Sequence, residues 1–144
     1  MQISYDEHLA YWQGVIHQEE LASRNLRKSI VNKLESISNN HEIEIVEAKV
    51  AGLTRSAINV QNALKWYSTQ LISGDATSPS TAVEENRHNR FLAKSEALWR
   101  SFLSEANAFD KQVAPIKENI EFLNWKYNNH PLTMRETGGK KDSK

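Results

Sequence analysis

One stretch of this sequence places apolar residues at alternating steps of three and four from residue 43 to residue 71. Its members are Ile43, Val46, Val50, Leu53, Ala57, Val60, Leu64, Tyr67 and Leu71. This heptad pattern is typical of a helix that buries one stripe of its surface against other helices. The stretch therefore predicts an all-α fold with coiled-coil-like packing, organised around a helix over residues 42–73.

A weaker apolar stripe with helical spacing precedes this stretch. Its members are Leu9, Trp12, Ile16, Leu26, Ile30, Leu34 and Ile37. Ser4 and Glu7 have the spacing of a capping box, so we expect a helix over residues 4–38. Gly14 lies inside this helix at a cost of about 1 kcal/mol relative to alanine, which indicates either close packing or a looser first turn.

The two stripes are separated by Ser38, Asn39, Asn40 and His41, and their heptad phases differ by one residue. Asparagine tolerates the left-handed backbone of tight turns, which favours a hairpin of two antiparallel helices. The alternative is one long helix with a skip in its heptads. The nearly equal lengths of the two arms favour the hairpin.

A linker rich in glycine, serine and proline follows at residues 74–80, and Thr81 with Glu84 forms a second capping box. A third stripe then runs through Leu92, Ser95, Trp99, Phe102, Ala106, Phe109, Val113, Ile116, Ile120, Leu123 and Tyr127. Pro115 lies within this stripe. Because proline removes a backbone donor and clashes with the preceding turn, we expect a kink or a short break near Val113.

These elements predict one domain over residues 1–130, folded as an elongated up-down-up bundle of three long antiparallel helices. The expected helices cover 4–38, 42–73 and 81–113, with a short fourth helix over 115–129 if the chain breaks at Pro115. The polar segment 131–144, punctuated by proline and glycine, is expected to be a flexible tail unless a partner orders it.

Charge and composition restrict the classes of function. The 144 residues include 18 lysines and arginines, 18 aspartates and glutamates and no cysteine, so neither a net charge that attracts nucleic acid nor thiol chemistry is expected. The sequence shows no signal peptide and no apolar window of about 20 residues that could span a bilayer. We expect a soluble intracellular protein, unless a targeting segment has been removed.

Motifs for catalysis or for a cofactor are weak. A carboxylate-bridged metal site in a helical bundle needs two Glu-x-x-His pairs, and only Glu85 and His88 form one. Neither a nucleophile elbow nor a glycine-rich phosphate loop occurs. The sequence predicts no catalytic residues, no metal and no cofactor, and a carboxylate-bridged metalloenzyme is the least favoured alternative.

Two basic clusters support another alternative, a helical module that binds a membrane surface or nucleic acid. The first cluster consists of Arg24, Arg27, Lys28 and Lys33, and the second contains Arg87 and Arg90. Acidic residues lie near both clusters, so neither forms a sustained positive stripe. Lys140, Lys141 and Lys144 would add weak attraction.

Several large apolar residues fall outside the strict heptad stripes and are candidates for contact with a partner. They are Ile58, Trp66, Ile72, Phe122 and Trp125. Trp66 and Trp125 either cap the core sideways or belong to an interface, where tryptophan is enriched. Together with the tail after His130, they favour a non-enzymatic structural or interaction subunit. Such a subunit would pack helical faces against partner chains or against copies of itself.

Overall fold

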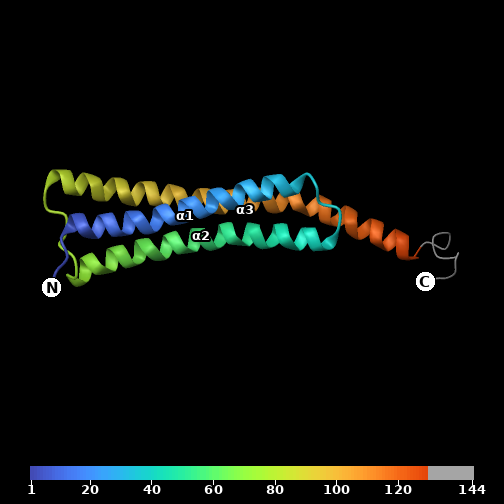
Figure 1. The fold of residues 1–144 in the computed structure, drawn as a ribbon. Coiled ribbons are helices and arrows are strands. Elements are labelled where there is room, and N and C mark those ends of the chain that lie inside the picture. Colours follow the sequence, from blue (N-terminus) through green and yellow to red (C-terminus); the bar gives the residue numbers. More distant parts are fainter. Residues whose placement is uncertain (130–144) are drawn as a thin grey trace.

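The computed structural model describes residues 1–129, which form three long helices: α1 (Tyr5–Leu34), α2 (Asn40–Ser73) and α3 (Ala82–Asn129). α1 and α3 run in the same direction and α2 runs in the opposite one, giving an elongated bundle (Figure 1). The predicted all-α, up-down-up architecture is confirmed. The expected tail over residues 131–144 lies outside the described residues. None of the described helices is long and apolar enough to cross a membrane.

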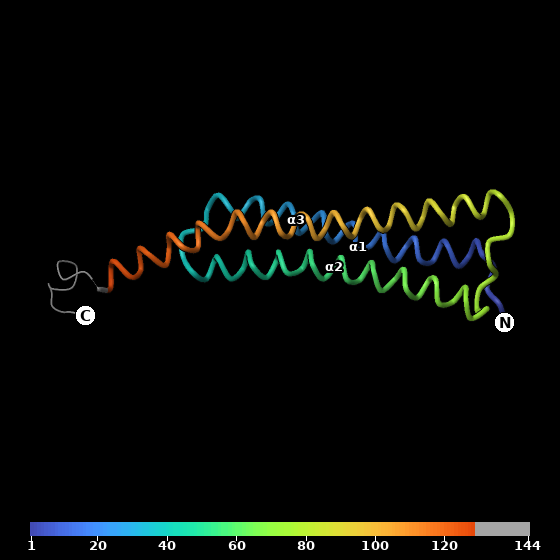
Figure 2. The backbone as a smooth tube through the Cα atoms, turned by 180° about the vertical axis from the view of Figure 1, so that it is seen from behind, coloured from blue at the N-terminus to red at the C-terminus, as the bar shows by residue number. Residues whose placement is uncertain are grey.

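The core of the bundle is the heptad stripe of α2. All of its predicted members are buried except Leu64 and Leu71, which are half-buried. α2 packs extensively against both α1 and α3, whereas α1 and α3 touch each other much less. The three helices run side by side over most of their length in both views (Figure 2). α2 is therefore the central helix.

The hairpin between α1 and α2 is confirmed, although α1 ends at Leu34, four residues before its expected end. Asn39 caps α2, since its side chain accepts a hydrogen bond from the backbone N–H of Glu42 at 2.9 Å. In return the Glu42 carboxylate accepts from the backbone N–H of Ser38 at 2.8 Å, which lowers the pKa of Glu42. This capping box begins α2 at Asn40, two residues before its expected start, and uses Ser38, which the apolar pattern had assigned to the end of α1.

The linker between α2 and α3 is tied to the N-terminal segment. α2 ends at Ser73, and its C-cap Gly74 has a φ of 84°, in the left-handed region that favours glycine. The backbone N–H of Ile3 donates to the carbonyl of Asp75 at 3.0 Å, and Ile3 accepts from Thr77 at 2.8 Å. These bonds lie beside the buried Ala76 and close that end of the bundle.

α3 passes through Pro115 as one continuous helix, so the short fourth helix is not formed as a separate element among the described residues. The heptad phase explains this result, because Val113 and Ile120 on either side of the proline are both buried in one core cluster. Pro115 itself is exposed, so water can satisfy the carbonyl that lost its donor. Beyond this point α3 projects past the turn between α1 and α2 (Figures 1 and 2).

Two helical glycines differ in their surroundings, and this difference predicts opposite responses to alanine. A Cβ on Gly14 would meet nothing within 4 Å, whereas one on Gly52 would lie 3.0 Å from Cδ1 of Leu26. Gly14→Ala should raise the free energy of unfolding in urea by about 1 kcal/mol through helix propensity. Gly52→Ala should give less than half of that gain, because Leu26 must move. Equal gains would show that α1 and α2 do not approach closely at Gly52.

Candidate functional site

The five off-stripe apolar residues are all exposed. Ile58, Trp66 and Ile72 lie on α2, and Phe122 and Trp125 lie near the end of α3. Trp66 is 57% exposed and Trp125 is 61% exposed, so neither ring is part of the bundle core. The alternative in which these rings cap the core sideways is therefore wrong.

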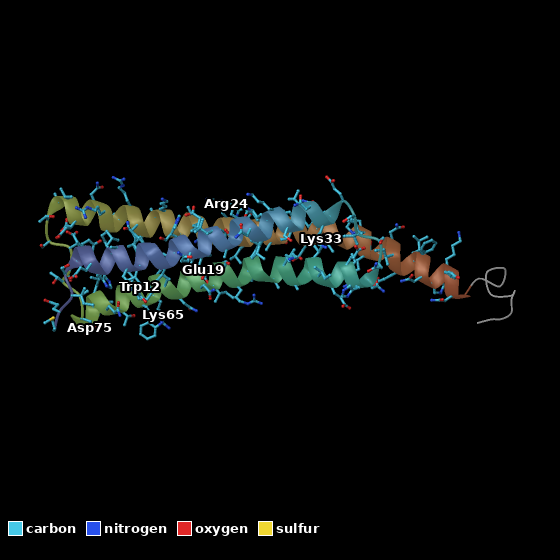
Figure 3. The ribbon with its side chains drawn as sticks, viewed as in Figure 1. Trp12, Glu19, Arg24, Lys33, Lys65 and Asp75 are labelled. Carbon is cyan, nitrogen blue, oxygen red and sulfur yellow. The ribbon has the colours of Figure 1, made fainter. Side chains whose placement is uncertain are left out.

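Trp66 belongs to an aromatic surface between α1 and α2. A cavity of about 590 Å³ is lined there by Ile3, Glu7, His8, Tyr11, Trp12, Trp66 and Gln70. Trp12 lies on α1 where it faces α2 (Figure 3), and its Nε1 donates to the side-chain oxygen of Gln70 at 3.0 Å. Tyr11 contacts Trp12 edge-on at 5.0 Å between ring centroids. Sequence reasoning missed Ile3 and Tyr11, and Ile58 and Ile72 do not line this cavity.

A second apolar surface covers the last described turns of α3, residues 121–128, which we call the α3 extension. Every residue of the extension is exposed. The sequence placed Leu123 and Tyr127 on the buried stripe of the third helix, and this prediction is wrong. The reason is that α3 projects past the turn between α1 and α2, so neither helix covers the stripe there. The rings of Phe122 and Trp125 stack at 6.1 Å between centroids.

The basic clusters do not merge into one surface. Arg24, Arg27, Lys28 and Lys33 lie on α1, where Figure 3 marks Arg24 and Lys33, while Arg87 and Arg90 lie at the start of α3. Arg27 forms an ion pair with Glu105 at 3.1 Å, and Arg87 forms one with Asp6 at 2.9 Å. Both of these pairs join α1 to α3, so two of the six cations serve contacts within the bundle.

A chain of polar side chains crosses the core near the same end as the aromatic surface. The hydroxyl of the fully buried Tyr67 on α2 lies 2.8 Å from the hydroxyl of Tyr5 on α1 and 2.7 Å from Nδ1 of His88 on α3. His8 stacks on the Tyr67 ring, and its Nε2 donates to the Tyr67 carbonyl at 3.0 Å. The sequence assigned Tyr67 to the apolar stripe, and this heptad position indicated burial but not hydrogen bonds to Tyr5 and His88.

The two tyrosine hydroxyls of this network are held in their neutral form. Burial is the main cause that raises the pKa of Tyr67, and the hydrogen bond with Tyr5 adds to it. Burial also raises the pKa of Tyr5. His88, which the sequence paired with Glu85 as a candidate metal ligand, directs Nδ1 at Tyr67 instead. Within residues 1–129, no three histidine, aspartate or glutamate side chains gather closely enough to hold a metal ion.

Comparison of the chain with protein-family models, with curated proteins and with solved structures found no match.

Removing the Tyr67 hydroxyl should destabilise the bundle. Tyr67→Phe leaves the Tyr5 hydroxyl and Nδ1 of His88 without their shared partner, so the free energy of unfolding should fall by about 1–3 kcal/mol in urea titrations. Tyr11→Phe is the matched control, because this ring is exposed, and it should change stability by less than about 0.5 kcal/mol. A Tyr67→Phe protein as stable as the control would show that the network contributes nothing to stability.

The raised pKa values also predict a loss of stability in alkali. Tyr5 and Tyr67 bind their protons more tightly when folded, so their contribution is present below the unfolded value of 10.0 and is lost as pH rises above it. The loss should approach about 1.4 kcal/mol per pH unit for Tyr67, and Tyr5 should add to it in the same direction. Urea titrations from pH 9 to 11 should show a shallower slope for Tyr5→Phe/Tyr67→Phe than for wild type.

Proposed function

We propose that this chain is a non-enzymatic structural or interaction subunit, which packs helical faces against partner chains or against another copy of itself. The observation that supports the proposal most strongly is the α3 extension. There the heptad stripe of α3 continues in phase beyond the part of the bundle that covers it.

The stripe changes from covered to uncovered within one turn. Val113 and Ile120 are buried against the end of the α1–α2 hairpin, and Ile116 packs against the same core cluster. Leu123, the next member of the heptad, is 52% exposed, and its neighbour Phe122 is 55% exposed. Fully burying a leucine or phenylalanine side chain stabilises by about 1.5–3 kcal/mol, so roughly half of that remains available at each position. A helix from a partner chain would be placed to bury them in the same knobs-into-holes manner.

The aromatic surface between α1 and α2 supports the same proposal. Trp66, Tyr11 and Trp12 come together there from two helices, although only Trp66 was expected to be exposed on sequence grounds. Tryptophan and tyrosine are enriched where protein interfaces gain most of their binding energy. The chain thus carries an aromatic surface near one end of the bundle and an apolar stripe at the other.

Binding to a membrane surface or to nucleic acid through the basic clusters is the alternative. Arg27 and Arg87 already form ion pairs within the bundle, which reduces the charge available to phosphates. The two functions respond differently to salt. Contacts with phosphates weaken steeply as salt rises, whereas burial of apolar side chains does not.

If the α3 extension binds a second copy, the molar mass in solution should exceed that of one chain at both low and high salt. Phe122→Ala/Leu123→Ala should return the protein to a monomer, as measured by light scattering after gel filtration. Val31→Ala, at another exposed apolar residue, is the control and should leave the mass unchanged. Wild-type protein that is monomeric at every concentration tested would contradict self-association.

If the partner is a different protein, a photo-crosslinking amino acid at Leu123 should give a discrete protein adduct in the protein's native cell. The same amino acid at Val31 should give none. A monomer in solution together with no adduct at Leu123 would contradict the proposed function.

A further inference from the structure

A groove of about 840 Å³ runs between α1 and the first half of α3, and we call it the α1–α3 groove. It exists because these two helices pack mainly against α2 and only sparingly against each other. Ion pairs that join α1 to α3 flank it on either side along the bundle, Asp6 with Arg87 and Arg27 with Glu105. The groove is separate from both the aromatic surface and the α3 extension.

The floor of the groove is apolar. Ile16 of α1 and Phe91 of α3 are buried members of the core cluster that also contains Tyr67, and Leu98 packs against this cluster while still lining the groove. Val83 lies near the start of α3 and is 62% exposed. An apolar ligand surface placed in the groove would therefore contact the existing core and cover Val83.

The α3 wall of the groove is positively charged. Arg90 and Lys94 stand one helical turn apart on this wall, and neither belongs to any ion pair between described residues. Glu20 is the acidic residue among those lining the groove, and it lies 3.5 Å from His17 on its own α1 wall. The groove thus combines an apolar floor with two uncompensated cations on one side.

We propose that the α1–α3 groove binds an acidic amphipathic helix of a partner protein. From Val83 to Leu98 the groove measures about 22 Å at 1.5 Å per residue, which is about four helical turns. The apolar face of such a helix would contact Ile16, Phe91 and Leu98 and would complete a four-helix arrangement. Acidic residues one turn apart on its flank would pair with Arg90 and Lys94. This proposal does not rest on the function assigned to the α3 extension.

Chain length argues against the protein's own C-terminal segment as the partner that pairs with Arg90. The described part of α3 ends at Asn129, about 58 Å from Arg90 at 1.5 Å per residue. The remaining 15 residues span at most about 54 Å, so they cannot reach Arg90 of their own chain. The segment also carries more lysine and arginine than aspartate and glutamate, which opposes its binding to the groove of another copy.

The observations also favour a helix over a second copy or a lipid. Two α1–α3 grooves that faced each other would place Arg90 and Lys94 against the same cations, which is unfavourable. A fatty acyl chain would lie against the polar side chain of Gln13 and would offer it no hydrogen-bond partner. Two cations one turn apart also match acidic side chains on successive turns of a helix better than they match a single anionic headgroup.

The test uses the full-length protein and a synthetic 18-residue amphipathic peptide with leucines at heptad positions a and d and glutamates at the flanking positions. A control peptide has lysines in place of the glutamates. Fluorescence anisotropy should show that the glutamate peptide binds at least about tenfold more tightly than the lysine peptide. Arg90→Glu/Lys94→Glu should weaken binding of the glutamate peptide by about tenfold or more and strengthen binding of the lysine peptide.

Arg24→Glu/Lys28→Glu is the matched control, because these two cations are also exposed and one turn apart but do not line the groove. It should change the affinity for the glutamate peptide by less than about twofold. Circular dichroism should show the same helix content for both variants. Val83→Glu should weaken binding of the glutamate peptide, although Arg90 and Lys94 remain in place on the α3 wall.

Three results would overturn the proposal. The first is wild-type protein that does not prefer the glutamate peptide. The second is an equal loss of affinity in the Arg24/Lys28 and Arg90/Lys94 variants, which would indicate charge attraction without a site. The third is tighter binding of oleate or of anionic phospholipid vesicles than of the glutamate peptide to wild type, with loss of that lipid binding in Arg90→Glu/Lys94→Glu, which would assign the groove to a lipid.

Discussion

Burial of the α2 stripe is the constraint on which the rest of the structure depends. This stripe runs the length of the helix, and covering it requires both α1 and α3, because one helix buries only one side. The two outer helices therefore face α2 more than each other. This arrangement buries the apolar stripe of α2 but leaves a groove between α1 and α3. The α1–α3 groove is thus a direct consequence of which helix carries the strongest stripe.

An apolar stripe alone would allow the helices to slide by one heptad, since the same kinds of side chain then meet again. The Tyr5–Tyr67–His88 chain opposes such a slide, because it joins three helices through bonds of 2.7–2.8 Å. A shifted register would bury the Tyr67 hydroxyl without these partners, at a cost of about 1–3 kcal/mol. At the other end of the bundle, Lys117 and Glu47 form an ion pair between α3 and α2 at 3.2 Å. That pair is partly exposed and restricts the register less.

Heptad spacing was sufficient to predict the fold, because it indicates which residues of each helix share the face that can be buried. It could not show whether another helix covers a stripe, and Leu123 and Tyr127 were misplaced for that reason. The continuity of α3 through Pro115 depended on packing on both sides of the proline, which local propensity does not include. For the candidate surfaces, the sequence identified Trp66 and Phe122 as large apolar residues that lie outside the heptad stripes. It could not group Trp66 with Tyr11 and Ile3, which meet only when α1 folds back against α2.

The continuity of α3 also connects the α1–α3 groove mechanically to the α3 extension. Leu98 in the groove and Leu123 on the extension are on one helix, about 37 Å apart at 1.5 Å per residue. Partners bound at both places would be held at a fixed spacing, because an uninterrupted helix transmits both distance and rotation. Pro115 lies between the two residues and lacks one backbone hydrogen bond, so it is the weakest point of this connection. Burial of Val113 and Ile120 in the bundle keeps that point helical, so the stiffness of the connection depends on the same α2 packing that forms the core.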